Sequence, residues 1–507
     1  MYEPLSHHDA GNDAIPPVSP ARPANQPVVI LPVAAILLLA SLALFVACWL
    51  WPNPRSFWGP TVSCALAWMF FLLHVVSARR TIAAFDPALW VPVLMLLHYF
   101  GMPVAVMMGF PAPTGYDAWD LGGLPREGQA FATALLTLVA FLAGLHLAGF
   151  APLQRDPDPP PADERSMNAP GTALFLVGFA MIVVGVWIAG ANLLFGDYGE
   201  MKEAEKFATA DLRFYGTGML FAMGGIYAML ASYRRESPWP ARLAIAGSVP
   251  ILILHVATGD RNGLAVFIMC GGFAITQRAR KLPRWIAIAG FAFALVFMPV
   301  IKEFRGAKEV SESSRMSVMQ LVGATFHEMG SSVQVFGWTL ATIPREKPYD
   351  LGMSIVSQLF GLIPNFGLTP GRQPLFGGID HKPSKWITKT ANPSKYEHFG
   401  GGYAFAIGAE WYFNLGMPGV FFGMLLTGFA TGKMRNACRR SAMWLILSTL
   451  FMSTMVLIVR NDLGYPARTA LWPLVALLVF RFAFGVLGFG RPLRQTEHGK
   501  ALLQHNE

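Results

Sequence analysis

The stretch VVILPVAAILLLASLALFVACWLW, residues 28–51, contains no charged residue. A helix needs about 20 mostly apolar residues to cross a bilayer core that is about 30 Å thick, so this stretch predicts a transmembrane helix. It is too long for the apolar core of a signal peptide, and no convincing cleavage site follows it. We therefore expect it to stay in place as a membrane anchor.

The composition of the whole chain points to the same environment. Of its 507 residues, 54% are hydrophobic and only 14% are charged, whereas soluble domains contain about 25% charged residues. This excludes a soluble cytoplasmic enzyme, a nucleic-acid-binding protein and a disordered scaffold. We attribute the net charge of +9 to cytoplasmic loops that face anionic lipid headgroups, and not to nucleic acid.

Similar apolar stretches recur along the chain and predict about twelve transmembrane helices. They cover residues 28–51, 57–78, 88–108, 130–150, 172–190, 212–232, 242–258, 262–276, 284–301, 417–434, 441–459 and 469–489. Nine of the predicted helices fall within 28–301 and three within 417–489. The polar, proline-rich residues 1–27 predict a disordered tail, and residues 490–507 form a second tail. No internal repeat of the kind found in inverted-repeat transporters is visible.

Positive charge predicts the orientation of these helices. Clusters of Arg and Lys fall in alternate connections, and one alternation places every cluster in the cytoplasm together with both termini. The clusters are Arg79-Arg80, Arg234-Arg235 with Arg242, Arg278-Arg280-Lys281-Arg284, Lys433-Arg435-Arg439-Arg440, and Arg491, Arg494 and Lys500 in the tail. The charge pattern therefore predicts a multi-pass membrane protein with an even number of spans.

The same alternation places one large loop, residues 302–416, on the outer face. Loops of this length are usually functional. From Arg315 to Ile343 apolar residues recur at helical spacing, and polar residues occupy the opposite side. This pattern predicts an amphipathic helix that lies on, or dips into, the outer leaflet.

Motifs of soluble enzymes are missing from the chain. No Walker A sequence, no HExxH and no GxSxG in a strand–helix context occurs. Asp156-Pro157-Asp158 matches the DxD pattern of metal-dependent sugar transferases, but it lies in a proline-rich linker without a nucleotide-binding domain around it. The four cysteines, which have no CxxC spacing, predict small apolar packing residues; they are Cys48, Cys64, Cys270 and Cys438. We therefore expect no metal site and no cofactor.

Cationic residues at the outer helix ends are the most informative anomaly, because short outer loops should be poor in Arg and Lys. The guanidinium group matches phosphate oxygens with two parallel hydrogen bonds and stays charged at physiological pH. These cationic residues therefore predict a site for a lipid-linked pyrophosphate. They are Arg261, Lys302, Arg305, Arg460 and Arg468. The competing interpretation is ion pairing with adjacent acids, namely Asp260, Glu303 and Asp462.

Three further residues are candidates for catalysis. His327 and Glu328 fall in the amphipathic stretch, where either side chain could orient or deprotonate an acceptor hydroxyl. A solvated polar face of an interfacial helix is the competing interpretation. Glu410 falls in an apolar run at the membrane edge, where an ionisable group is costly and is usually functional or paired. A salt bridge between Glu410 and an outer arginine accounts for it equally well.

Several motifs of the outer loop resemble the O-antigen polysaccharide polymerase (Wzy) family. The first block includes His327 to Ser332, Ile343-Pro344, Pro348 to Gly352 and Ile363-Pro364-Asn365. The second is the run from Gly401-Gly402-Tyr403 to Ala409-Glu410-Trp411-Tyr412-Phe413-Asn414-Leu415-Gly416, and the outer turn Gly259-Asp260-Arg261 is also similar. The resemblance is sharp from Gly259 to Gly416 and architectural elsewhere. His327 before the family-like Glu328 is a departure.

The resemblance implies a glycosyltransferase of the bacterial inner membrane, with its large outer loop in the periplasm. Such an enzyme moves a growing glycan from undecaprenyl pyrophosphate to an incoming lipid-linked repeat unit at the periplasmic face. Arginines that stabilise the leaving pyrophosphate would make such a transfer metal-independent. The expected fold is an all-α polytopic integral membrane protein, GT-C-like, with amphipathic helices in its large outer loop. Expected partners are undecaprenyl-pyrophosphate-linked oligosaccharides, membrane lipid, a chain-length regulator (co-polymerase) and a repeat-unit flippase.

Three other functions remain open on the sequence. An O-antigen ligase, which passes glycan to the lipid A core, would also have outer arginines and a long outer loop. A flippase or transporter of lipid-linked oligosaccharide would also have twelve spans, but it should line a cavity in mid-membrane with charge. The charges here gather at the outer ends and in one loop, which favours an enzyme. A structural assembly scaffold is a further alternative.

Overall fold

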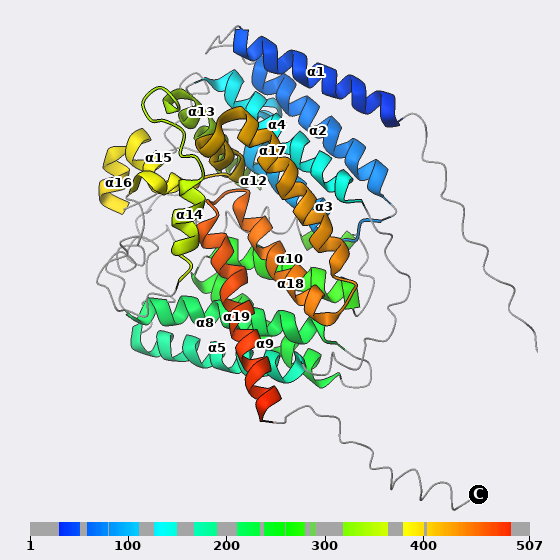
Figure 1. Cartoon of the computed structure of the whole chain (residues 1–507), viewed down its shortest axis with the longest axis vertical. Coiled ribbons are helices and arrows are strands. Elements are labelled where there is room, and N and C mark those ends of the chain that lie inside the picture. Colours follow the sequence, from blue (N-terminus) through cyan, green and yellow to red (C-terminus); the bar gives the residue numbers. More distant parts are fainter. Residues whose placement is uncertain are drawn as a thin grey trace, which may run out of the picture.

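The computed structural model describes residues 30–50, 58–79, 81–110, 126–149, 167–189, 210–233, 238–258, 260–278, 318–363, 379–399 and 403–487, and four residues within 285–290. Within these ranges the regular elements are helices, and no strand occurs (Figure 1). The long apolar helices are α1 (Ile30–Leu50), α2 (Trp58–Ala78), α3 (Pro87–Met107), α4 (Glu127–Ala148), α5 (Asn168–Ala189), α8 (Ala210–Ala231), α9 (Trp239–Thr258), α10 (Arg261–Arg278), α17 (Ile407–Ala437), α18 (Ala442–Ile458) and α19 (Gly464–Val486).

The predicted all-α polytopic membrane fold is confirmed. Nine of the described helices are long and apolar enough to cross a membrane. The spans expected at 262–276 and 441–459 coincide with α10 and with the shorter apolar helix α18. The span expected at 284–301 lies outside the described residues except for four positions, and both expected tails also lie outside them. Twelve helices and the GT-C-like arrangement therefore stay predictions.

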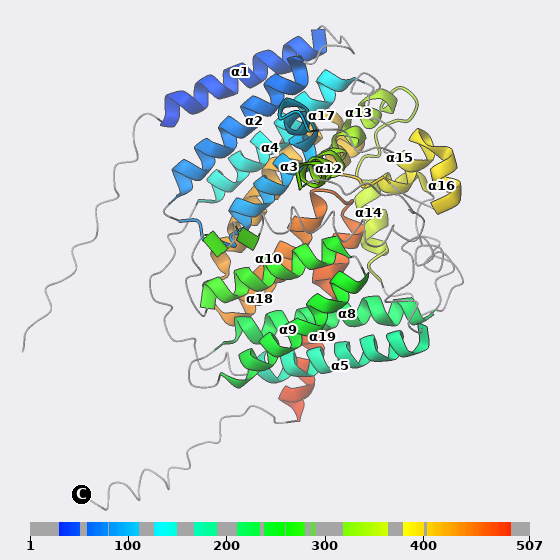
Figure 2. The same ribbon diagram turned by 180° about the vertical axis from the view of Figure 1, so that it is seen from behind.

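The long helices form two groups that lie side by side in both ribbon views (Figures 1 and 2). In the first group α17 packs along α4, and α1, α2 and α3 surround α4. In the second group α5 packs along α8, next to α9, α10 and α19. Helix α18 joins the groups, because it contacts α10, α19 and α8 on one side and α17 and α3 on the other.

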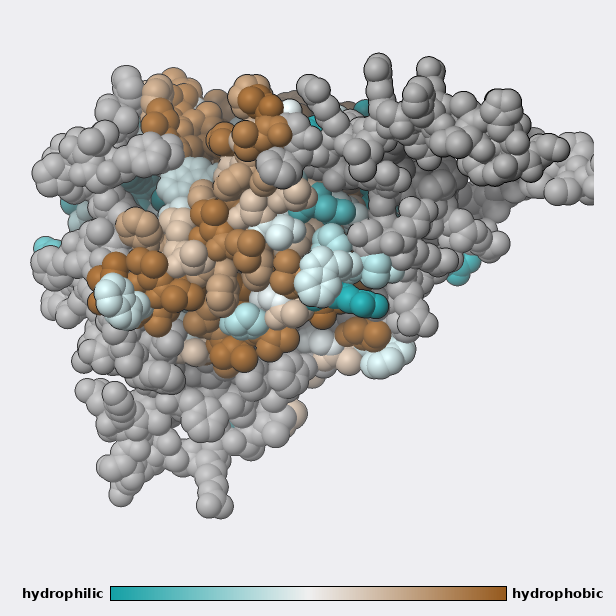
Figure 3. Space-filling model, turned by 90° about the horizontal axis from the view of Figure 1, so that it is seen from below, coloured by the Kyte–Doolittle hydropathy of each residue, from teal (hydrophilic) through white to brown (hydrophobic). Residues whose placement is uncertain are grey.

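The outside of the bundle is apolar, as a lipid environment requires. Figure 3 views the molecule from below Figure 1, on the side of α5, α9 and α19, and brown apolar side chains dominate the described part of this face. Exposed examples on these helices are Trp187, Ile253 and Phe482. The four cysteines are buried and free, which confirms their predicted role as apolar packing residues.

Small residues bring α4 and α17 into close contact. A methyl group on Gly144 of α4 would overlap the carbonyl oxygen of Leu425, and one on Gly428 of α17 would overlap the carbonyl oxygen of Phe141. Glycine at the contact lets two backbones approach closely, which is a common way to pack membrane helices. The α4–α17 contact therefore depends on these two positions.

We expect Gly144→Ala to destabilise the protein by about 1–3 kcal/mol, because the added methyl group forces α4 and α17 apart. Gly271→Ala is the matched control, since a methyl group there meets nothing within 4 Å. The thermal unfolding of both purified variants in detergent is the measurement. Equal unfolding temperatures would contradict the close contact.

The helices of the predicted outer loop gather at one end of the bundle (Figures 1 and 2), which we call the loop end. They are α12 (Val318–Gly330), α13 (Val333–Thr342), α14 (Met353–Phe360), the 3₁₀ helix η3 (Ile379–His381), α15 (Pro383–Ala391) and α16 (Pro393–Phe399). The single amphipathic helix predicted from Arg315 to Ile343 is wrong within the described residues. The structure has two helices, broken at Ser331-Ser332.

The break has a physical cause in the packing of α12 against α3. A methyl group on Gly330 would overlap the backbone of Met102, and one on Gly101 would lie 2.8 Å from the carbonyl oxygen of Phe326. The hydroxyl group of Ser331 donates to the carbonyl oxygen of Glu328 at 2.7 Å. Helix α13 then turns into the protein, where Phe336 is buried. These contacts bury part of the apolar face inside the protein.

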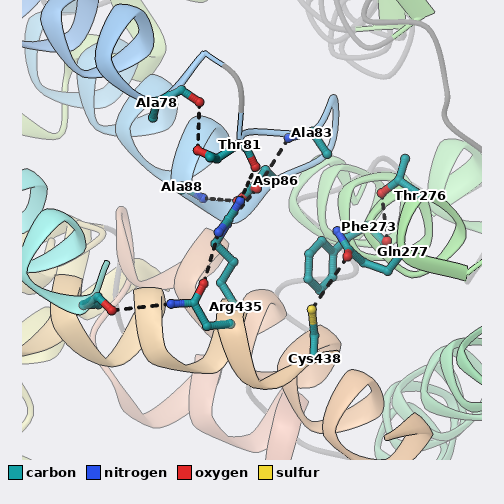
Figure 4. Close-up of polar contacts among 12 residues, drawn as sticks. Ala78, Thr81, Ala83, Asp86, Ala88, Phe273, Thr276, Gln277, Arg435 and Cys438 are labelled. Atoms are coloured by element: carbon teal, nitrogen blue, oxygen red, sulfur yellow. Dashed lines mark hydrogen bonds and ion pairs between the residues drawn. The ribbon is translucent and has the colours of Figure 1, made fainter. Parts of the chain in front are cut away.

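A buried ion pair lies at the opposite end of the bundle (Figure 4). Asp86 caps the start of α3 by accepting from the backbone N–H of Ala88, and both of its oxygens accept from Nε of Arg435, at 3.0 and 2.8 Å. Arg435 also donates to the carbonyl oxygen of Thr81. The pair joins the α2–α3 turn to the end of α17.

Candidate active site

Two blocks of the family-like motifs lie against each other at the loop end. The backbone N–H of Asp350 donates to the carbonyl oxygen of Phe413, and that of Leu351 donates to the carbonyl oxygen of Asn414, both at 3.0 Å. The backbone N–H of Gly352 donates to Oδ1 of Asn414 at 2.8 Å. Segments that are distant in the sequence thus form one unit.

This unit has an unusual backbone. Leu351 has a φ of 49° and Gly352 a φ of 90°. A non-glycine residue in the left-handed region stores strain, and such residues cluster at functional sites where neighbours hold them in place. Gly416 has a φ of 69° and breaks α17 into two helical segments. A methyl group on Gly416 would lie 2.9 Å from the hydroxyl oxygen of Tyr349, so only glycine fits this contact.

Glu410 lies at the centre of the unit and is buried, with 1% of its surface exposed. Its Oε1 accepts from Nε2 of Gln358 at 2.7 Å and from the hydroxyl group of Ser354 at 3.3 Å. Its Oε2 accepts from the backbone N–H of Leu463 at 3.1 Å. The salt bridges among the described residues do not include Glu410. Within this part of the chain its hydrogen-bond donors are neutral groups from α14 and from the turn before α19.

The turn between α18 and α19 places a second carboxylate near Glu410. Asp462 lies within electrostatic range of Glu410, and its Oδ2 accepts from the hydroxyl group of Ser384 at 2.6 Å. Burial raises the pKa of Asp462, whereas the hydrogen bonds from Ser384 and the charges of Arg468 and Lys382 oppose the rise. The charges that act on Asp462 are thus those of Arg468 and Lys382, whereas the ion-pair interpretation assigned it to Arg460, two residues away.

Arg460 lies on the same turn, near the polar residues His98 and Glu328. The charges of Arg460 and Glu328 both act on the buried ring of His98 in α3. Nδ1 of His98 lies 3.2 Å from the carbonyl oxygen of Met329 and 3.4 Å from the hydroxyl oxygen of Ser332. The α18–α19 turn therefore brings Glu328, Arg460, Arg468 and Glu410 to one end of the bundle.

The remaining predicted site residues lie apart from this turn or outside the described residues. His327 faces the end of α3, where burial lowers its pKa while a hydrogen bond to the backbone of Phe110 opposes the shift. The ring of Phe326 beside it stacks on Phe110. Arg261 begins α10, but its side chain lies outside the described residues, as do Lys302 and Arg305.

The site consists of carboxylates, hydroxyl and amide groups, and cations from α12, α14, α15, α17 and the α18–α19 turn. No group of three or more His, Cys, Asp and Glu side chains in the described part of the chain is arranged to hold a metal ion. Such a set can bind an anion and hydrogen-bond sugar hydroxyls. No pattern in the sequence marked Gln358, Ser354 and Ser384, which become partners only through the fold.

Fold and site together define a multi-pass membrane protein with a polar, partly cationic site at one end of its helix bundle. The family model of the O-antigen polysaccharide polymerase Wzy matches residues 61–487. This range covers most of the chain, which therefore belongs to that family, as the motifs predicted. Comparison with curated proteins and with solved structures finds no match. The family implies a polymerase of the glycosyltransferase type in a bacterial membrane.

Proposed function

We propose that this chain polymerises polysaccharide repeat units at the periplasmic face of the inner membrane. It transfers the growing glycan from undecaprenyl pyrophosphate to the sugar of an incoming lipid-linked repeat unit, for O-antigen or exopolysaccharide. One observation best supports the proposal: the family-like motifs lie close to Arg460 and Arg468, next to the α18–α19 turn at the loop end. A GT-C-like arrangement of the spans is part of the proposal.

The proposed transfer is a displacement at the anomeric carbon of the donor sugar. The acceptor hydroxyl oxygen forms the new bond to this carbon and loses its proton, and the bond to the pyrophosphate oxygen breaks. The pyrophosphate leaves with the electron pair, so cations placed near it stabilise the transition state more than the ground state. Arg460 and Arg468 would have this role, together with Arg261, Lys302 and Arg305, without a metal ion.

The carboxylates have different proposed roles because their burial differs. Glu328 is partly exposed and acts with Arg460 in the electrostatic environment of His98, so it can orient an acceptor hydroxyl. Glu410 is buried among protein donors and positions the α18–α19 turn through Leu463. Two lipid-anchored substrates held side by side at this end would also gain from proximity.

Reporter fusions test the proposed topology. A fusion at Lys347, in the loop end, should report the periplasm, and one at Arg439, near the Asp86–Arg435 pair, should report the cytoplasm. Fusions at both termini should also report the cytoplasm. Equal signals at Lys347 and Arg439 would contradict the orientation.

Glycan analysis of a deletion strain tests the function itself. Loss of long polymer with accumulation of single capped repeat units supports a polymerase. Polymer that remains on its lipid carrier indicates a ligase instead, and repeat units that never reach the outer face indicate a flippase. Co-purification from the native strain tests the proposed chain-length regulator and repeat-unit flippase as partners.

We expect Arg460→Ala and Arg468→Ala each to lower polymer formation about 100-fold, the loss typical of one transition-state donor. Arg→Lys variants should recover little, because a point charge does not reproduce the planar fork. The same loss is expected for Arg261→Ala and Arg305→Ala. The polymer ladder and the level of membrane-inserted protein are measured in the same cells, and Lys389→Ala, an exposed residue of α15, is the control. Full activity of both variants of the α18–α19 turn would refute the pyrophosphate site.

A further inference from the structure

A histidine–aspartate pair lies in the loop end beside the unit that holds Glu410. Nδ1 of His381, in η3, is 2.7 Å from Oδ1 of Asp350. Nζ of Lys347 lies 3.2 Å from the same oxygen and 4.0 Å from the ring centre of Phe413. The side chain of Asp350 is 2% exposed and that of His381 is 31% exposed. The pair thus has a buried acid and a histidine that reaches the surface.

The carboxylate fixes the tautomer of the histidine. A carboxylate only accepts hydrogen bonds, so Nδ1 of His381 is the donor and Nε2 of the neutral ring has the free lone pair. Among the described residues Nε2 has no hydrogen-bond partner. Oδ2 of Asp350 also has none there, so His381 and Lys347 share the other oxygen of this carboxylate. This arrangement orients an imidazole as a proton acceptor and stabilises the imidazolium that forms.

The backbone around Asp350 holds the acid in place. Leu351, whose backbone is strained, and Gly352 follow it directly, and the backbone N–H of Asp350 donates a hydrogen bond to the carbonyl oxygen of Phe413. On the other side of His381, the chain continues into Lys382 and Ser384, which act on Asp462. Asp462 in turn is near Arg468 and Glu410. The histidine is therefore connected to the turn that bears the proposed pyrophosphate-binding arginines.

We propose that His381 is the general base that takes the proton from the acceptor hydroxyl, and that Asp350 is its positioning residue. This proposal rests on the proposed polymerase function. The hydroxyl proton moves to Nε2 of His381, the acceptor oxygen bonds to the anomeric carbon of the donor, and pyrophosphate leaves with the electron pair. The substrate class at this position is the non-reducing sugar of a lipid-linked repeat unit.

The test uses membrane vesicles that contain the full chain and undecaprenyl-pyrophosphate-linked repeat units extracted from the deletion strain. His381→Asn retains an amide N–H that can donate to Asp350, but it cannot accept a proton in catalysis. We expect His381→Asn and His381→Ala both to lose about 100-fold in polymerisation rate, as general-base removal typically does, with normal protein levels. Added imidazole should partly restore His381→Ala, because the side chain it replaces reaches the surface. Lys389→Ala should behave as the wild type.

Asp350→Asn tests whether Asp350 positions His381 for catalysis or only stabilises the local fold. The amide oxygen still accepts from Nδ1, so the fold is expected to remain, but the charge that stabilises the imidazolium is lost. We expect a lower kcat with an unchanged KM for the acceptor lipid. An active His381→Asn variant, or a His381→Ala variant that imidazole does not restore, would reduce the pair to a structural brace and overturn the proposal. Failure of the wild-type vesicles to polymerise would instead contradict the proposed function.

Discussion

Glu410→Ala is expected to abolish polymer and to leave little folded protein in the membrane. The substitution removes the acceptor of three hydrogen bonds, from Gln358, Ser354 and the backbone of Leu463. The hydroxyl group of Ser354 can still donate to Oδ1 of Asn414, but Nε2 of Gln358 and the N–H of Leu463 lose their acceptor. A buried donor without a partner costs about 1–3 kcal/mol, so the two losses together remove a large part of the stability of a typical domain. Quantification of membrane-inserted protein after the cells are shifted to a higher temperature is the measurement.

Glu410→Gln is the matched substitution, because it keeps the shape and removes the ionisable group. Oε1 of Gln358 has no hydrogen-bond partner among the described residues, so its amide group can rotate and accept from the new amide at position 410. Protein level should therefore stay near that of the wild type while the polymer ladder is lost. Glu397→Gln, an exposed change on α16, is the control. A normal level of Glu410→Ala protein would contradict a stabilising role of the hydrogen bonds to Glu410. A normal polymer ladder from Glu410→Gln would show that polymerisation does not need the carboxyl group of Glu410.

The difference between the expected and the observed partners of Glu410 shows what the sequence could not provide. Because Glu410 lies in an apolar run, its ionisable group needs partners. This need can be read from the local sequence. The partners themselves, Gln358 and Ser354, lie 52 and 56 residues away along the chain. They are neutral residues without a recognisable pattern. An arginine was the natural expectation because the outer arginines were the visible candidates.

The membrane spans, in contrast, could be predicted from local sequence. The length of an apolar run decides whether a helix can cross the bilayer, and nine such runs appear as long helices among the described residues. The break at Ser331-Ser332 could not be predicted in this way. Apolar residues continue at helical spacing through it, and only the close contact of Gly330 with Met102 reveals why the chain turns.

The motifs of the outer loop were informative in a different way. Pro348 to Gly352 and Ala409 to Gly416 stood out by resemblance alone, and the structure adds the reason that they occur together. Gly352 and Gly416 both have positive φ values, and the two segments share backbone hydrogen bonds. His381 lies outside both motifs and has no sequence signal, although it contacts Asp350. Contacts of this kind depend on tertiary structure.

Arg435→Met is expected to destabilise the protein by about 3–5 kcal/mol, because it leaves the carboxylate of Asp86 buried without its counter-charge. The positive-inside pattern predicted Arg435 as one of a cytoplasmic cluster, but its side chain is 3% exposed. Arg440→Met removes a charge from the same cluster at an exposed position and is the control. The unfolding midpoint of the purified variants in detergent is the measurement.

The double variant Asp86→Asn/Arg435→Met shows whether the loss comes from the uncompensated charge. After Asp86→Asn, the side-chain oxygen at this position can still accept from the backbone N–H of Ala88, so the cap of α3 is retained. With both charges gone, no ion remains buried, and replacing a buried pair by neutral groups is often close to neutral in free energy. The double variant should therefore be more stable than Arg435→Met alone. Because the pair lies at the end of the bundle opposite Glu410, polymer formed per folded molecule should match the wild type. A double variant no more stable than Arg435→Met would mean that the hydrogen bond from Arg435 to Thr81, and not the charge of Asp86, accounts for the loss.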